Sequence, residues 1–397
     1  MRLPVLENLS ASGPARLAQG QFDTGPRSIA AVRVLRISLT DRCNFRCVYC
    51  MPEEGVPWLP RDHILSFEEI CDIVRAAIEI HGIRRFKLTG GEPTVRSGLA
   101  DLVMMLCRIR GIEDLSLTTN GMLLEDLAHP LKQAGLDRVT VSIDSLRPDR
   151  FKRITRTGDL AQVMRGLDAA EDAELLPLKV NCVTMRGTND DEFVDFARLS
   201  LSRRLTIRFI EYMPLGDAVL MHGPGRPAES RGSNGQGTLL PSTRDPLPSV
   251  DASEMGPAGG CGAQNRGDVL VPEAEVRARI ENELGPLVPV DRASEAGVGP
   301  ANVYRLEQGN PRGRIGFISA MSAPFCATCN RLRLTADGVL RSCLFEGGEV
   351  PIRELMRSFK DPAQRWRAVA HAMAECVRLK PDVHGAHGNE QMSRIGG

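Results

Sequence analysis

The chain has no apolar run as long as the roughly 18 to 20 residues that a membrane-spanning helix needs, so we expect no membrane partner. It also has no excess of charge of either sign, because 50 Lys and Arg residues balance 50 Asp and Glu residues. This balance argues against a globally basic nucleic-acid-binding protein, and we expect no nucleic-acid partner. Any recognition of phosphate must therefore come from a local group of basic side chains.

The N-terminus lacks a secretory signal, which removes the usual reason to interpret the 11 cysteines as a disulfide framework. Six of these cysteines fall into two groups that are too tight for disulfides. Residues 1–32 carry acidic as well as basic side chains and match an Arg-rich, acid-poor transit peptide badly. We expect them to form an N-terminal extension that is disordered or serves targeting.

Short β-rich runs alternate with amphipathic helical stretches over residues 33–220. Strands at such spacing predict parallel βαβ units. Six units indicate an α/β fold, a partial (β/α)6 barrel with its site at the C-terminal ends of the strands. The expected strands are Val32–Leu39, Arg85–Thr89, Leu115–Thr119, Arg138–Ile143, Leu178–Thr184 and Leu205–Glu211.

The first helix of this series has a clear start. Ser66 followed by Glu69 is typical of a capping box, and an apolar stripe from Ile70 to Ile78 follows. Gly82, Gly111 and Gly135 stand where this helix and later ones would end, which completes the pattern.

Residues 222–268 differ from the rest, because they are rich in Gly, Pro, Ser and Asn and contain no aromatic residue. Such a composition cannot bury enough apolar surface to order itself, so residues 221–270 are predicted to be a flexible insertion. The C-terminal region, residues 271–397, has an expected helix at Pro272–Leu284. Its expected strands are Val303–Leu306 and Arg314–Ser319.

Cys43, Cys47 and Cys50 form a C-x3-C-x2-C group just after the first expected strand. Three thiolates on a short loop can hold three irons of a [4Fe–4S] cluster and leave the fourth iron open. The alternatives are a zinc site or three incidental thiols. Zinc ribbons prefer paired C-x2-C units, so the spacing favours the cluster.

Cys326, Cys329 and Cys343 form a second group, C-x2-C-x13-C. A structural zinc site is the serious alternative here. Such a site would usually need a fourth Cys or His nearby, and residues 320–350 contain neither a fourth cysteine nor a histidine. Three ligands again predict a cluster with an open position, in this case for a substrate.

Cations occur among apolar neighbours on or near several of the expected strands, at Arg36, Lys87, Lys179 and Arg208. A buried cation is costly unless it meets an anion. Internal salt bridges are one explanation for each residue. Several cations that converge on one barrel mouth favour a bound triphosphate instead. The Arg331–Arg333 stretch directly follows a cysteine of the second group and should face the same ligand.

The cysteine loop, RISLTDRCNFRCVYC, resembles that of radical S-adenosylmethionine (SAM) enzymes, with Tyr49 as the aromatic residue before the third cysteine. The run Gly90-Gly91-Glu92-Pro93 resembles the motif that holds the amino end of SAM in that family. Further ordered motifs, namely TTNG, VSIDSL, LKVNCVTMRG, RFIEYMP, FCATCNRLRL and a terminal Gly-Gly, narrow the resemblance. Over residues 33–220 and 303–397 the chain is similar to the GTP 3′,8-cyclases, the MoaA family of molybdenum-cofactor biosynthesis.

This resemblance implies a lyase with two [4Fe–4S] clusters and SAM that converts GTP to (8S)-3′,8-cyclo-7,8-dihydroguanosine 5′-triphosphate. In the family, reductive cleavage of SAM gives a 5′-deoxyadenosyl radical that takes hydrogen from the ribose C3′, which then attacks C8 of guanine. The implied partners are a reductant or electron-donor protein and the downstream cyclic pyranopterin monophosphate synthase, with a homodimer left open.

The resemblance assigns residues to each ligand. The metal ligands are the two cysteine groups. The SAM contacts are Tyr49, Gly91, Glu92, Ser142 and Met213. The GTP contacts are Arg36, Lys87, Thr118, Lys179, Arg331, Leu332 and Arg333, with Arg85 and Arg208 as additions. Gly396 and Gly397 are expected to reach into the active site.

Two other interpretations of the function remain open. A different radical SAM enzyme of the peptide-maturase type would carry a longer cysteine-rich C-terminal region, and a non-enzymatic iron–sulfur or zinc protein would not need the strand cations.

Lys87 stands where many family members have Arg, which keeps the charge but loses the bidentate fork. The runs MPEEGVP and GGEPTVR look closest to eukaryotic members, which would place the protein in the mitochondrial matrix, and otherwise in the cytoplasm.

Overall fold

The computed structural model describes residues 25–215, 269–291, 299–308, 313–345 and 347–385. Three predictions lie mostly or wholly outside these residues, namely the N-terminal extension, the insertion at 221–270, of which only residues 269 and 270 are described, and the Gly396-Gly397 end. Among the described helices, none combines the length and the apolar character needed to cross a membrane.

Six parallel strands form the centre of the fold, in the order in which they occur along the chain. The six predicted strands are all present, and their ends differ from prediction by at most two residues. They are β1 (Val34–Ser38), β2 (Arg85–Thr89), β3 (Asp114–Thr119), β4 (Arg138–Ser142), β5 (Leu178–Thr184) and β6 (Leu205–Glu211). The α/β prediction is therefore confirmed.

The C-terminal region extends this sheet at both edges. β9 (Arg314–Ile318) pairs in parallel with β6, and β10 (Arg331–Leu334) pairs in parallel with β1. Antiparallel strands complete the two sides, β8 (Asn302–Leu306) and β7 (Leu287–Pro289) beyond β9, and β11 (Val339–Arg341) and β12 (Glu349–Pro351) beyond β10. The chain segments predicted as barrel and C-terminal region thus share one sheet of 12 strands.

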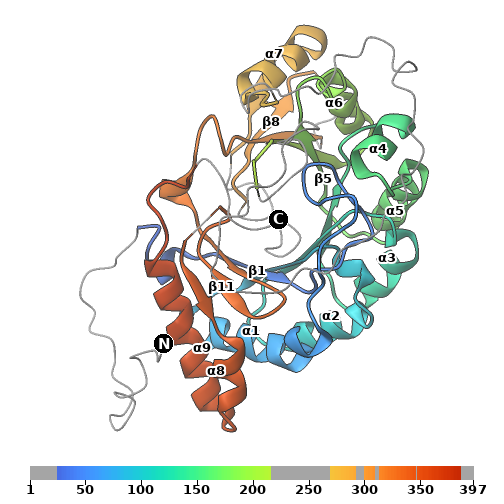
Figure 1. The fold of residues 1–397 in the computed structure, drawn as a ribbon. Coiled ribbons are helices and arrows are strands. Elements are labelled where there is room, and N and C mark those ends of the chain that lie inside the picture. The colour runs from blue at the N-terminus through green and yellow to red at the C-terminus, as the bar shows by residue number, and fades with distance from the viewer. Residues whose placement is uncertain (1–24, 216–268, 292–298, 309–312, 346, 386–397) are drawn as a thin grey trace, which may run out of the picture.

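Helices α1 to α6 cover the outer side of the curved sheet, with α5 next to α3 and α4 beyond it (Figure 1). The predicted capping box opens α1, because Ser66 accepts from the Glu69 N–H and Glu69 accepts from the Ser66 N–H. Gly82 ends the same helix in the left-handed conformation, at φ 66°. The helices are α1 (Phe67–His81), α2 (Leu99–Cys107), α3 (Leu124–Gln133), α4 (Pro148–Thr155), α5 (Leu160–Asp172), α6 (Phe193–Ser202), α7 (Glu273–Leu284), α8 (Arg353–Ser358) and α9 (Pro362–Arg378).

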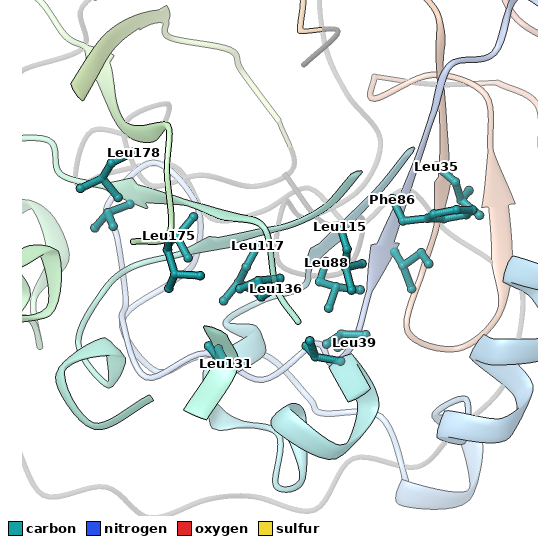
Figure 2. Packing of buried hydrophobic residues seen from close by; sticks show 14 of the residues in the cluster. Leu35, Leu39, Phe86, Leu88, Leu115, Leu117, Leu131, Leu136, Leu175 and Leu178 are labelled. Carbon is teal, nitrogen blue, oxygen red and sulfur yellow. The ribbon is translucent and has the colours of Figure 1, made fainter. Parts of the chain in front are cut away.

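The hydrophobic core lies between the strands and these helices. Leu35, Phe86 and Leu115 are neighbours across β1, β2 and β3 and are fully buried (Figure 2). Successive side chains of a strand point to opposite faces of the sheet. The residues that follow them in sequence, Arg36 and Lys87, therefore point toward the inside of the barrel. This alternation is what gathers cations in the interior.

Candidate active site

The first cavity of the site, here called the cysteine-loop cavity, is lined by all three cysteines of the first group. Its other walls come from the ends of β2, β3 and β4. Four of the five predicted SAM contacts line it, namely Tyr49, Gly91, Glu92 and Ser142. The structure thus brings together side chains that are up to 99 positions apart in the chain, as the C-terminal edge of a parallel sheet requires.

The thiols of this cavity lie in surroundings that oppose ionisation. Burial raises the pKa of the Cys43 thiol to about 12, and the nearby carboxyl of Glu92 adds to the effect. Burial also raises the pKa of Cys47, with Cys50 and Asp144 contributing. Thiolates form here only beside a strong positive charge. Three half-buried thiols around one cavity fit an iron–sulfur cluster, whose iron ions supply that charge.

The Gly90-Gly91 turn holds the cysteine loop by direct contact between backbones. The Gly91 N–H donates to the Thr40 carbonyl at 2.7 Å, and the Glu92 N–H donates to the Arg42 carbonyl at 2.8 Å. A Cβ atom on Gly91 would lie 2.5 Å from the Arg42 oxygen. Glycine is therefore required here for packing against the cysteine loop, a reason that the motif alone does not reveal.

We expect Gly91→Ala to loosen this loop. Because the clashing atoms are backbone, relief requires a shift of the whole turn, which should lower the free energy of unfolding by about 1–3 kcal/mol. The measurements are urea unfolding and iron content after anaerobic reconstitution. Gly82→Ala is the control, since a Cβ there meets open space and costs only the left-handed conformation, about 1 kcal/mol, with no loss of iron. An intact iron content in Gly91→Ala would contradict the role in loop placement.

Glu92 closes the wall of the cavity next to this turn. Its two carboxyl oxygens accept hydrogen bonds from Thr94, from the Thr119 hydroxyl at 2.7 Å and from the Asn120 N–H at 2.7 Å. Burial raises the pKa of this carboxyl although these donors oppose the shift. Glu92 thus joins the turn after β2 to the end of β3.

Asp144 is a site residue that the sequence reasoning missed. The Tyr49 hydroxyl donates to its Oδ2 at 2.7 Å, and the Val183 N–H donates to its Oδ1 at 2.8 Å. Burial raises the pKa of Asp144 to about 6. Asp144 therefore ties the cysteine loop to β4 and β5. It lies within the motif VSIDSL, which by itself did not indicate a contact with Tyr49.

We expect Asp144→Asn to weaken this tie. An amide has one acceptor oxygen instead of two, so the Tyr49 hydroxyl and the Val183 N–H can no longer donate to separate carboxylate oxygens, and the loss of one such bond costs about 1–3 kcal/mol. SAM affinity and the free energy of unfolding should both fall, as measured by equilibrium binding and urea titration. The exposed Asp149→Asn serves as the control. Wild-type values of both quantities in Asp144→Asn would show that the tie is dispensable.

The second cavity, here called the cation cavity, is lined by Cys326, Cys329 and Cys343. Five of the predicted GTP contacts with charged side chains also line it, namely Arg36, Lys87, Arg208, Arg331 and Arg333. Thr118 borders both cavities, so they adjoin at β3. Met213, predicted to contact SAM, borders the cation cavity and not the cysteine-loop cavity.

Strand pairing places the cations side by side. Arg36 on β1 is in register with Lys87 on β2 and with Arg333 on β10. Arg208 approaches from β6, and its Nη2 and the Lys87 Nζ each donate to the Thr140 hydroxyl at 3.3 Å. Within the described residues, Lys87 and Arg208 take part in no salt bridge, so the internal-salt-bridge explanation is wrong for these two.

This arrangement is electrostatically unfavourable without an anion. Burial lowers the pKa of Lys87 well below its ordinary value, and the charges of Arg208 and Arg36 lower it further. Burial likewise lowers the pKa of Arg36, with Arg333 and Arg331 as the next causes. A polyanionic ligand in the cavity would reverse this effect on each group.

Three predicted GTP contacts lie elsewhere. Arg85 forms a salt bridge with Glu113 at 3.1 Å and does not line the cavity. Lys179 is half-buried on β5 and is also not among the lining residues. Leu332 is fully buried in the hydrophobic core, because it alternates on β10 with the two arginines that face the cavity. The side chain of Leu332 therefore does not line the cation cavity, and its predicted GTP contact stays a prediction.

The second cysteine group lies in surroundings that favour a thiolate. Arg331 Nη2 donates to the Cys329 Sγ at 3.5 Å. Burial alone would raise the pKa of Cys329, but the charges of Arg331 and Lys380 outweigh it and lower the pKa to about 7. A low thiol pKa suits a metal ligand. Within the described ranges, no three His, Cys, Asp or Glu side chains are grouped as they would be around one metal ion.

Comparisons with known proteins agree with this arrangement. Residues 37–200 match the Radical SAM superfamily, and residues 253–386 match the family described as Molybdenum Cofactor Synthesis C. The GTP 3′,8-cyclase of Pelotomaculum thermopropionicum is 44% identical over 92% of this chain and 98% of its own length. That of Moorella thermoacetica is 42% identical over 92% of this chain and 98% of its own length.

Among solved structures, SuiB of Streptococcus suis bound to S-adenosylmethionine aligns with a TM-score of 0.39 and 15% identity, over 47% of this chain and 42% of that chain. The named relatives are bacterial and give no support to a mitochondrial location. Two family matches that cover both halves of the site, together with near-full-length relatives, lead to one conclusion. The chain belongs to the GTP 3′,8-cyclase family of radical SAM enzymes, which functions in molybdenum cofactor biosynthesis.

Proposed function

We propose that this chain converts GTP to (8S)-3′,8-cyclo-7,8-dihydroguanosine 5′-triphosphate, the first step of molybdenum cofactor biosynthesis. The observation that carries the proposal is the pair of adjoining cavities. One is lined by three half-buried thiols and the glycine turn, and the other by three further thiols and five cations. Thr118 borders both, so ligands in the two cavities would meet at β3.

On the cysteine-loop side, Cys43, Cys47 and Cys50 would hold a [4Fe–4S] cluster. When bound there, the cluster and SAM supply the radical that removes a hydrogen atom from the substrate. The chain's own contribution is placement. Gly91 and Ser142 form the SAM wall, and Tyr49, held by Asp144, fixes the loop that carries the thiols.

On the other side, the cations would bind the triphosphate of GTP. Lys87 and Arg208 are the best supported, because both line the cavity and the only hydrogen-bond acceptor described for their side chains is the Thr140 hydroxyl. Arg36 and Arg333 extend the same row across β1 and β10. Charge-assisted hydrogen bonds to phosphate are the strong kind, and they would hold the ribose next to the SAM side.

Cys326, Cys329 and Cys343 would hold a second [4Fe–4S] cluster with one iron open to the substrate. The low pKa of Cys329 and the lining of the same cavity support this assignment. A zinc ion is the alternative occupant. The family resemblance adds Gly396 and Gly397 as residues of this site, and an electron-donor protein and the downstream cyclic pyranopterin monophosphate synthase as partners.

The deciding experiment is product analysis after anaerobic incubation of the reconstituted protein with SAM, reductant and GTP. The expected result is the cyclised nucleotide together with 5′-deoxyadenosine and methionine. SAM cleavage that GTP does not stimulate, with no cyclised nucleotide formed, would instead indicate a different radical SAM enzyme. Stoichiometric zinc in anaerobically prepared protein would contradict the second cluster.

A further inference from the structure

Lys380 is a buried lysine just beyond the end of α9, and its backbone is fixed on both sides. It is 3% exposed. Its N–H donates to the Val377 carbonyl at 3.1 Å, and its carbonyl accepts from Arg27 Nε at 2.8 Å. The side chain therefore leaves a rigid junction between the last helix and the N-terminal entry to the barrel.

The ammonium group of Lys380 reaches the loop that carries the second cysteine group. Nζ donates to the Cys329 carbonyl at 3.1 Å and to the Arg331 carbonyl at 3.2 Å, and it lies 3.9 Å from the Cys329 Sγ. These two carbonyls lie at the point where the C-x2-C loop enters β10. One side chain thus fixes the loop and also places a charge against a proposed cluster ligand.

No carboxylate of the described residues balances this charge. Within the residues that the structure describes, Lys380 takes part in no salt bridge, and its donors meet only carbonyls and sulfur. A buried ammonium without an anion is costly. The sulfur that the ammonium faces is that of Cys329, so a negatively charged cluster held by this cysteine would balance its charge.

We propose that Lys380 is a positioning residue for the second cluster, which fixes the Cys329 loop and raises the reduction potential of the cluster through its charge and its contact with sulfur. The inference rests on the proposed function, because it requires that Cys326, Cys329 and Cys343 hold a cluster. Hydrogen bonds to the sulfurs and nearby charge are established determinants of such potentials. A fixed cation stabilises the reduced cluster, which carries one more negative charge, and so raises the potential.

The test separates the effect of the Lys380 charge from the effect of its hydrogen bonds to the loop. Lys380→Gln keeps a donor for the loop carbonyls but removes the charge, and Lys380→Arg keeps the charge. Both are made in full-length chain that carries Ala at Cys43, Cys47 and Cys50, so that only the second cluster remains. The exposed Lys360→Gln is the matched control. The readouts are iron content and a redox titration followed by electron paramagnetic resonance.

The background protein and its Lys360→Gln form should bind roughly four irons, with one midpoint potential. Lys380→Gln should retain the iron and shift the midpoint to a more negative potential, and Lys380→Arg should restore it. An unshifted potential in Lys380→Gln with full iron would overturn the inference. If Lys380→Gln loses the cluster, the Lys380→Arg variant decides. A Lys380→Arg protein that keeps the iron content and the midpoint potential of the background protein supports the inference, and loss of the cluster in both variants overturns it. A background protein without a cluster would show instead that the two-cluster proposal is wrong.

Discussion

Protein in which Cys43, Cys47 and Cys50 are all replaced by Ala should lose SAM cleavage entirely. The three thiols line one cavity with the glycine turn and with Tyr49 and Ser142, and no other thiol of the described residues lines it. Their loss removes every proposed ligand of the first cluster while the hydrophobic core stays intact. Anaerobic reconstitution should give roughly four irons where the wild type gives roughly eight, and 5′-deoxyadenosine should not be detectable.

The converse variant has Ala at Cys326, Cys329 and Cys343. It should also hold roughly four irons, but it should still cleave SAM while cyclisation of GTP fails, because the cysteine-loop cavity is untouched. Cys71→Ala is the control, since this buried thiol lies on α1 in the core. SAM cleavage that persists in the first variant, or that disappears in the second, would contradict the assignment of the two groups.

Replacing Arg333 by Met should reduce the affinity for GTP by about 1.5–3 kcal/mol, the worth of a hydrogen bond to a charged group. This corresponds to roughly 10- to 150-fold in the dissociation constant. SAM affinity should not change, because Arg333 lines only the cation cavity. Isothermal titration with each ligand measures both quantities.

The same variant gives a second readout that a structural arginine would not give. Burial lowers the pKa of Arg333, and the charge of Arg331 lowers it further, so the charged side chain is unfavourable in the free protein. Met fills a similar volume without the charge. The unfolding midpoint of the ligand-free variant should therefore equal or exceed that of the wild type. Arg84→Ala, at an exposed arginine beside Glu113, is the control. Lower stability with unchanged GTP affinity would make Arg333 structural.

The strands and the first helix could be predicted because local patterns determine them. Ser66 and Glu69 form a capping box from neighbouring residues alone, and the runs at 85–89 and 205–211 are buried strands of the expected length. β10 escaped prediction because it is only four residues long, although its alternation of arginine with leucine is typical of a strand. Its partner β1 lies about 300 residues earlier in the chain, and sequence periodicity does not specify such pairing.

The residues of the candidate site likewise divide into those that local sequence patterns reveal and those that depend on partners far away in the chain. The cysteine groups could be found from spacing, and the strand cations from the cost of burying charge. Asp144 and Lys380 could not, because their partners Tyr49 and Cys329 lie 95 and 51 positions away. The motif names Leu332 together with Arg331 and Arg333, but the strand places its side chain on the opposite face from theirs, in the core, and sequence alone did not separate the two faces.

The pairing of β9 with β6 and of β10 with β1 also bears on how the chain matures during synthesis. When residue 215 has left the ribosome, all six central strands exist, but β1 and β6 each present an unpaired edge. Unpaired edges are templates for association with other chains. Both are closed only after residues 314–334 emerge, so the nascent barrel passes through a stage in which both of its edges are open to pairing with other chains.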